Sequence, residues 1–260
     1  MNRAFQLKQP SNTKRQSLEH EERESFRINK YLTASGFCSR READRLVDER
    51  RVTIDGQLAV QGSKVFPGQT VQVDRQRIAA AQAHVYIALN KPIGITCTVD
   101  QAIDGNIVDF MDYPYHRIFP IGRLDKDSSG LILLTSDGDI VNKILRAENN
   151  HEKEYIVEVS DEIHPSFIKK MSAGVEITNM RSKAREFTKR CVVQQLTPRT
   201  FKIILTQGLN RQIRRMCSEL GYRVTVLRRI RIMNIHLGNL KVGQWRYLTQ
   251  EELNTLSKSF

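Results

Sequence analysis

The sequence predicts an α+β fold: a small basic domain followed by a larger one with a mixed, largely antiparallel sheet flanked by helices. Its 260 residues are more than one small core needs. Strand-like and helix-like segments intermix without the regular alternation of a doubly wound sheet. A short AAAQAH stretch separates two differently patterned parts. We therefore expect a disordered polar tail over 1–25, the small domain over 26–80 and the large domain over 81–260.

The charge balance favours a polyanionic partner. Lys and Arg number 41 against 29 Asp and Glu, a formal net charge of +12, and cationic groups that neutralise phosphates release bound counterions. The 4 cysteines lack the paired spacing of zinc or redox sites, so we expect reduced thiols. No apolar run could cross a bilayer, and the first residues lack the apolar core of a signal peptide. We expect a cytoplasmic protein without membrane contact.

Two helices open the small domain. Apolar residues at helical spacing from Ile28 to Leu32 predict the first, which Gly36 ends. Ser39 followed by Glu42 predicts a capping box at the start of the second. This second helix should have an apolar inward face and a basic outward face, formed by Ala43, Leu46 and Val47 and by Arg40, Arg41 and Arg45 respectively.

Short strands follow, and the whole small domain resembles the S4-type RNA-binding domain. RVTIDG and VQVD alternate like strands, with turn signals at Asp55-Gly56 and Pro67-Gly68. The resemblance implies that the basic face of the second helix, with Arg40, Arg41 and Arg45, contacts RNA. The residues that carry it are Arg27, Leu32, Gly36, Ser39, Arg40, Ala43, Leu46, Val52, Gly56 and Gly68.

The large domain mixes strands and helices. VYIALNKPIGITCT predicts a strand over 85–90, interrupted at Lys91-Pro92 and Gly94, and a second strand behind it. KEYIVEVS and TFKIILTQG predict further strands, and PSFIKKMSAG and NRQIRRMCSELG predict helices. In RRIRI, strand alternation predicts that Arg229 and Arg231 share one face and Arg228 the other, with RNA contact slightly favoured over a solvated face.

The stretch DKDSSGLILLTSDGD holds the candidate chemistry. Asp125, Asp127, Ser129 and Gly130 stand where a calcium loop has its first ligands and glycine, but Ser136 replaces the final glutamate. LILLT also predicts a buried strand where a helix should begin. Calcium binding is therefore disfavoured.

The surroundings of Asp125 suit a reactive carboxylate. Turn residues surround it, and Arg123 and Lys126 add positive charge that would keep it ionised. Without a neighbouring histidine, it fits a nucleophile better than a general base. An ordinary surface turn, an aspartyl-phosphate former and a glycosidase with Asp127 or Asp137 as second carboxylate all remain open from these residues alone. Otherwise Asp127 is expected to have no role beyond the turn.

Four segments in order resemble the pseudouridine synthases, in the branch that includes the small- and large-subunit rRNA enzymes. They are KPIGITCT, GRLDKDSSGLILLT, HEKEYIVEV and QGLNRQIRRMCSELGYRV. With the small domain, the resemblance covers roughly residues 26 to 250. It implies a catalytic domain that breaks the N1–C1′ bond of a flipped uridine and rejoins the base through C5, without a metal or cofactor.

The resemblance also implies residue roles. Asp125 would be the nucleophile, Tyr155 would stack on the target base and Arg214 would pair with the carboxylate. The partner would be structured RNA, mainly large-subunit rRNA with a tRNA loop left open, bound by a monomer; the alternative is a non-catalytic RNA-binding protein. The further residues expected to contact RNA are Arg123, which would fill the gap left by the flipped nucleotide, Leu124, Lys126, Asn210, Arg211, Gln212 and Arg215.

Overall fold

The computed structural model describes residues 25–79, 84–114, 117–145, 151–179 and 182–258. The expected polar tail lies outside these residues apart from Ser25, and the expected domain boundary at residues 80 and 81 lies outside them as well.

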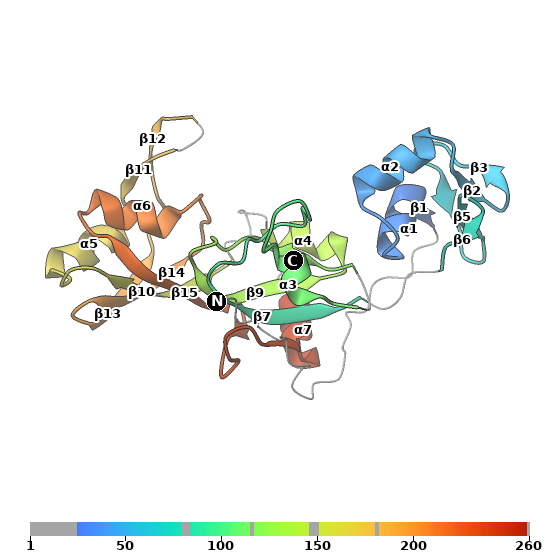
Figure 1. Ribbon diagram of the computed structural model, residues 1–260. Helices are drawn as coiled ribbons and strands as arrows, with labels where there is room; N and C mark the ends of the chain where they lie inside the picture. The colour runs from blue at the N-terminus through green and yellow to red at the C-terminus, as the bar shows by residue number, and fades with distance from the viewer. Residues whose placement is uncertain (1–24, 80–83, 115–116, 146–150, 180–181, 259–260) are drawn as a thin grey trace.

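The small domain has its own hydrophobic core, in which Leu32, Ala43, Leu46 and Val52 are buried. Helices α1 (Ile28–Ala34) and α2 (Arg40–Asp48) pack against each other and against short strands (Figure 1). The strands form a sheet of order β3-β2-β5-β6 and a separate pair, β1 with β4. Their bounds are β1 (Phe26–Arg27), β2 (Val52–Ile54), β3 (Gln57–Leu58), β4 (Lys64–Val65), β5 (Val71–Val73) and β6 (Gln76–Arg77).

The predicted cap of α2 is half right. Ser39 Oγ accepts the Glu42 N–H at 3.1 Å, which confirms the N-cap. The Glu42 carboxylate does not reach back to complete a capping box, because it accepts a hydrogen bond from Arg45 at 2.5 Å. An arginine three residues further along the same face is a competing partner of opposite charge.

A nine-stranded sheet forms the large domain, in the order β13-β14-β10-β15-β9-β7-β17, with β16 beside β15 and β8 beside β9. Only β9 and β15 pair in parallel, so the mixed, largely antiparallel sheet is confirmed. The bounds are β7 (Tyr86–Lys91), β8 (Phe119–Ile121), β9 (Ser129–Thr135), β10 (Lys153–Val159), β13 (Val192–Thr197), β14 (Thr200–Leu205), β15 (Val224–Ile232), β16 (Ile235–His236) and β17 (Trp245–Tyr247).

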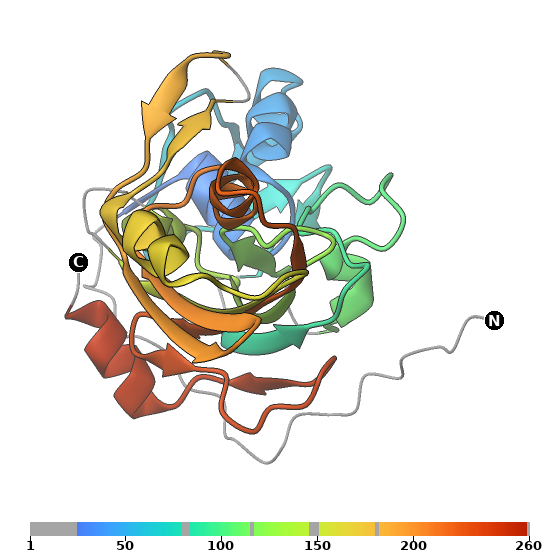
Figure 2. The same ribbon diagram turned by 90° about the vertical axis from the view of Figure 1, so that its left-hand side faces the viewer.

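Helices cover both faces of this sheet (Figure 2). On one face, α5 (Pro165–Ala173) and α6 (Gln212–Glu219) pack on β10 and β14, while α3 (Ile107–Met111) packs on β7 and β9. On the other face lie α4 (Gly138–Leu145) and α7 (Gln250–Ser257). A hairpin of β11 (Glu176–Thr178) and β12 (Arg185–Phe187) projects from the sheet (Figure 1).

The second strand expected after Gly94 does not form. Thr96 makes only an isolated bridge with Asn106, whose side chain caps α3. Cys97 is buried and Ile95 partly buried, so the alternation in this segment reflects packing against the core rather than ladder pairing.

One row of cross-strand neighbours runs through the middle of the sheet. Lys91 on β7 pairs with Gly130 on β9, Gly130 with Arg229 on β15, and Arg229 with Tyr155 on β10. We call these four residues the central row. Directly paired residues point to the same face, and at Gly130 the backbones of β9 and β15 approach too closely for a side chain.

Gly130 is required by both its conformation and its neighbour. Its φ is +103°, and a Cβ there would lie 2.2 Å from the carbonyl oxygen of Arg229.

We expect Gly130→Ala to lower the free energy of unfolding by about 2–4 kcal/mol, because the clash is with backbone. Gly138→Ala, where the nearest atom is 3.9 Å away, is the control and should change stability little. Urea unfolding of both variants measures this; equal midpoints would contradict it.

Candidate active site

Asp125 lies in the loop that enters β9, held by two contacts to the Lys-Pro-x-Gly segment. Its carbonyl accepts the Ser128 N–H at 3.0 Å, which closes a tight turn. The Lys126 carbonyl accepts the Gly94 N–H at 2.8 Å, and the Leu124 N–H contacts Cys97 Sγ at 3.4 Å. Two of the motifs found in the sequence are therefore neighbours in space.

Helix α6 and its N-cap residue direct two arginines at this loop. Arg211 Nη1 lies 3.8 Å and Arg214 Nε 3.9 Å from Oδ2 of Asp125. These are ion-pair distances rather than hydrogen bonds, and within the described part of the chain nothing hydrogen-bonds the Asp125 carboxylate. Asp125 thus has cationic neighbours while its oxygens stay available, with the side chain 28% exposed.

Asp127, not Asp125, is the hydrogen-bonded anchor of the two arginines. Arg211 binds both of its carboxylate oxygens at 3.1 Å, and Arg214 donates to its carbonyl at 3.0 Å and to Ser128 Oγ at 3.1 Å. The Arg211 hydrogen bonds lower the pKa of Asp127. The expectation that Asp127 has no role beyond the turn was therefore wrong. Its partners are 84 and 87 residues away, too distant for a local pattern to reveal.

Tyr155 joins the site from the middle of the sheet, partly buried between the α5–α6 and α3 clusters. The Arg229 guanidinium lies over its ring, 5.9 Å from the centroid. Arg229 is only 5% exposed and donates to Leu131 O at 2.7 Å and to Arg123 O at 3.4 Å. Sequence reasoning missed this residue as part of the site.

The predicted shared face of Arg229 and Arg231 is wrong, and a bulge is the reason. The register shifts between Glu154 and Tyr155, so the two arginines pair with consecutive residues, which point to opposite faces. Arg231 donates to Glu154 at 2.7 Å and to Glu152 at 2.9 Å. The exposed Arg228 lies next to the buried Arg229.

The remaining predicted RNA contacts divide by exposure. Arg123, Lys126, Asn210 and Arg211 are exposed. Leu124 and Gln212 are buried, at 7% and 4% exposed, so their side chains are not available to RNA; Gln212 accepts the Leu209 N–H instead. Arg215 is turned toward the β11–β12 hairpin and donates to Thr178 O at 2.5 Å.

The geometry does not support the glycosidase alternative. Asp137 is 2% exposed, and its carboxylate accepts from the Tyr86 hydroxyl at 2.7 Å and the Asp139 N–H at 3.0 Å. Asp127 is bound by Arg211. Neither stands as a second free carboxylate beside Asp125. In the described ranges no cluster of three or more His, Cys, Asp or Glu could hold a metal, and none of their helices is long and apolar enough to span a membrane.

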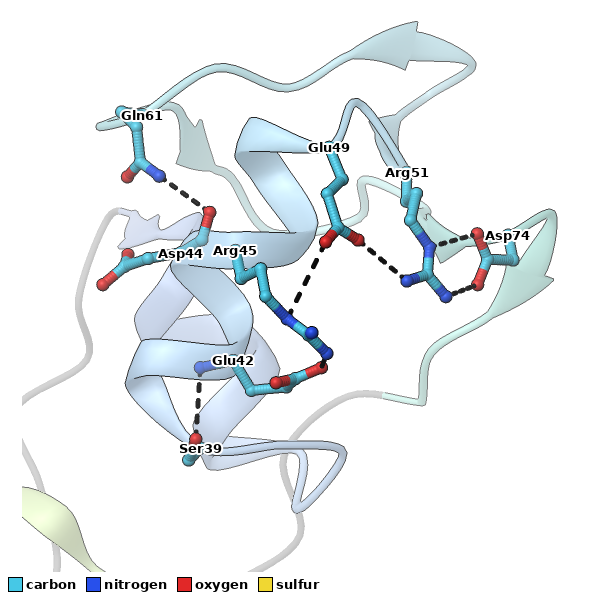
Figure 3. A network of polar contacts seen from close by, with 8 residues as sticks. All are labelled: Ser39, Glu42, Asp44, Arg45, Glu49, Arg51, Gln61 and Asp74. Carbon is cyan, nitrogen blue, oxygen red and sulfur yellow. Dashed lines mark hydrogen bonds and ion pairs between the residues drawn. The ribbon is translucent and has the colours of Figure 1, made fainter.

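The basic face of α2 is largely compensated by acidic neighbours (Figure 3). Arg45 lies 2.5 Å from Glu42 and 3.8 Å from Glu49, and Glu49 also pairs with Arg51 at 2.9 Å. Across the domain boundary, Lys30 ion-pairs with Asp139 at the start of α4, and Arg40 lies 3.6 Å from the same carboxylate. Arg41 is exposed and has no carboxylate within ion-pair distance among the described residues.

Comparison with known proteins agrees with this arrangement. The RNA pseudouridylate synthase family model matches residues 85–219, and the S4 domain model matches residues 26–71. The chain belongs to the RNA pseudouridylate synthase family and carries an S4 domain, so it is an enzyme that isomerises uridine in RNA rather than a non-catalytic RNA-binding protein.

Its relatives place it more closely. The chain is 52% identical over 236 residues to the dual-specificity RNA pseudouridine synthase RluF of Escherichia coli K12, covering 90% of this chain and 79% of that protein. This confirms the resemblance to the pseudouridine synthases noted in the sequence. An uncharacterised RNA pseudouridine synthase of Aquifex aeolicus is 32% identical, covering 90% and 97%. A crystal structure of a pseudouridylate synthase superposes with a TM-score of 0.64 at 27% identity, covering 88% and 99%.

Asp127→Asn should impair turnover through the arginines. The amide cannot hold Arg211 in a charged, two-point contact, so the cations beside Asp125 lose their position. We expect a single-turnover rate about 10- to 100-fold lower, the cost of misplacing groups near the chemistry. Asp104→Asn, an exposed carboxylate elsewhere, is the control. Tritium release from C5-labelled uridine in transcribed RNA measures the rate; a value within threefold of the unaltered enzyme would refute this positioning role.

The arginines of α2 should differ in their contribution to RNA binding. Arg41→Ala should reduce the slope of log Kd against log salt by about one, the value for one lost phosphate contact. Arg45→Ala should change the slope by less than half as much, because Glu42 and Glu49 already compensate its charge. Filter binding to transcribed rRNA over a salt series distinguishes them; equal slope changes would contradict the difference.

Proposed function

We propose that this chain converts a uridine of large-subunit (23S) rRNA to pseudouridine, acting as a monomer in the cytoplasm, with a tRNA loop as second substrate. The observation that carries the proposal is the 52% identity over 90% of the chain to a dual-specificity RNA pseudouridine synthase. The S4 domain and the net charge of +12 support a large, structured RNA as the partner.

Asp125 is the nucleophile in this proposal. Its carboxylate has two arginine nitrogens at 3.8 and 3.9 Å, which place positive charge beside it without consuming its oxygens in hydrogen bonds. Tyr155, partly exposed at the centre of the sheet, offers a ring face for the flipped base. Arg123, exposed beside the nucleophile, would occupy the gap in the RNA stack.

The reaction needs no co-reactant because it is an isomerisation. The N1–C1′ bond breaks and its electron pair stays with the base, while the Asp125 carboxylate bonds to C1′; this bond breaks again when C5 takes its place. The base turns, the C5–C1′ bond forms, C5 loses its proton and N1 gains one. All atoms of the uridine are kept. Arg214, partly buried and bonded to the loop, keeps positive charge at the nucleophile throughout.

Asp125→Asn should abolish the chemistry while sparing RNA binding. The amide keeps the shape of the side chain but removes the nucleophilic charge. In a strain lacking the gene, chemical mapping of pseudouridine should show one large-subunit rRNA site restored by the unaltered enzyme and not by Asp125→Asn, with RNA affinity within about threefold. Residual turnover within tenfold of the original would move the chemistry to another residue.

The same map tests the substrate. If only tRNA or small-subunit rRNA lost pseudouridine on gene deletion, the large-subunit target would be wrong while the family assignment would stand.

A further inference from the structure

The chemistry just described leaves Arg229 without a task, although it is a buried charge at the centre of the site. Its Nε and Nη1 donate to Leu131 O and Arg123 O. Its Nη2 is buried and has no hydrogen-bond partner among the described residues. Buried donors are normally satisfied, so this nitrogen is the unexplained polar atom of the central row.

The two satisfied nitrogens have a structural explanation. Along one edge of β9, the strand β15 pairs at Ser129 and Gly130, and β8 takes over from Leu133. The Arg229 Nε bond to Leu131 O fills the place between these two partners. This bridging bond from Nε requires neither Nη2 nor a full positive charge on Arg229.

The guanidinium also borders the space where the base would bind. Arg229 donates a hydrogen bond to the carbonyl oxygen of Arg123, which lies two residues before Asp125 in the same loop. The guanidinium also lies over the Tyr155 ring, with its carbon 5.9 Å from the ring centroid. A base placed between the proposed nucleophile and the stacking ring would therefore lie within reach of Arg229.

Two further cations strengthen the positive potential there. Lys91 is fully buried and donates only to the carbonyls of Pro92 and Ile95. Lys153 donates to His151 O, and burial followed by the charge of Arg229 lowers its pKa. Neither lysine has a carboxylate as hydrogen-bond partner in the described structure. Buried cations satisfied only by carbonyls suit a site that must stabilise negative charge.

We propose that Arg229 is a catalytic residue: Nη2 donates to a carbonyl oxygen of the target uracil, and the guanidinium charge stabilises the base as an anion after the N1–C1′ bond breaks. The electron pair left on N1 spreads over both ring carbonyls, so the developing charge lies on atoms that Arg229 can reach. The negative charge on the base disappears when C5 bonds to C1′. C5 then releases its proton and N1 takes one up. This role rests on the proposed isomerisation at Asp125.

Single-turnover kinetics of three variants test the role. Arg229→Gln should slow tritium release about 100- to 1,000-fold, as loss of one preorganised donor to a developing anion does, with RNA affinity within about threefold. Arg229→Lys keeps the charge without the planar fork and should lose about tenfold. Arg228→Gln, the exposed neighbour, is the control. If Arg229→Gln folds and reacts within threefold of the original, Arg229 has only the structural role of bonding Leu131 O between β15 and β8.

A binding measurement keeps the test independent of turnover and of the RNA target. 5-Fluorouracil mimics the detached base, and its ring proton leaves readily because fluorine withdraws electrons. The ¹⁹F signal of the base bound to the full-length enzyme should show half-ionisation at a pH about one unit or more below that of the free base. Arg228→Gln should keep this shift and Arg229→Lys most of it, and Arg229→Gln, where folded, should lose it.

The outcomes separate the two proposals. An unshifted ionisation in the unaltered enzyme would overturn the role of Arg229 even if Arg229→Gln did not fold. Absence of turnover on large-subunit rRNA, with the ionisation still shifted, would overturn the proposed substrate and leave Arg229 as an anion-stabilising contact for uracil.

Discussion

The close contact of β9 and β15 at Gly130 is the constraint on which the site depends. The two strands pair in parallel over only two positions, and a side chain at Gly130 would collide with the backbone of Arg229. This approach aligns Lys91, Arg229 and Tyr155 across adjacent strands. It also fixes the start of β9, and with it the tight turn that presents Asp125. Sheet geometry thus brings the Asp125 loop and the Tyr155 ring to the same guanidinium, that of Arg229.

Two carboxylates in one turn divide the work of binding the arginines. Asp127 takes the hydrogen bonds of Arg211 and, through its backbone carbonyl, one from Arg214. Asp125 receives their charge at 3.8 and 3.9 Å without a hydrogen bond. A carboxylate bound in two-point contact would be a poor nucleophile, because its lone pairs would be engaged. The paired Asp127 therefore leaves the oxygens of Asp125 available beside two positive charges.

Local patterns in the sequence predicted the elements and the family, and missed contacts set by tertiary structure. Periodicity located β10, β14, α5 and α6, and the motif around Asp125 indicated the chemistry. The Asp127–Arg211 contact spans 84 residues, so no local spacing reveals it. Arg229 was assigned to the same face as Arg231 because strict alternation was assumed across a bulge. The capping box at Ser39 failed because Arg45 offered Glu42 a charged partner.

The cations of the central row lower stability in the free protein. Lys91 is fully buried, and desolvation lowers its pKa, so carrying a proton at neutral pH costs folding free energy. Arg229 adds a second buried charge with one nitrogen unpaired. Such a local conflict with stability is expected where charge must be ready for a reaction, since a preorganised site needs no rearrangement when negative charge develops.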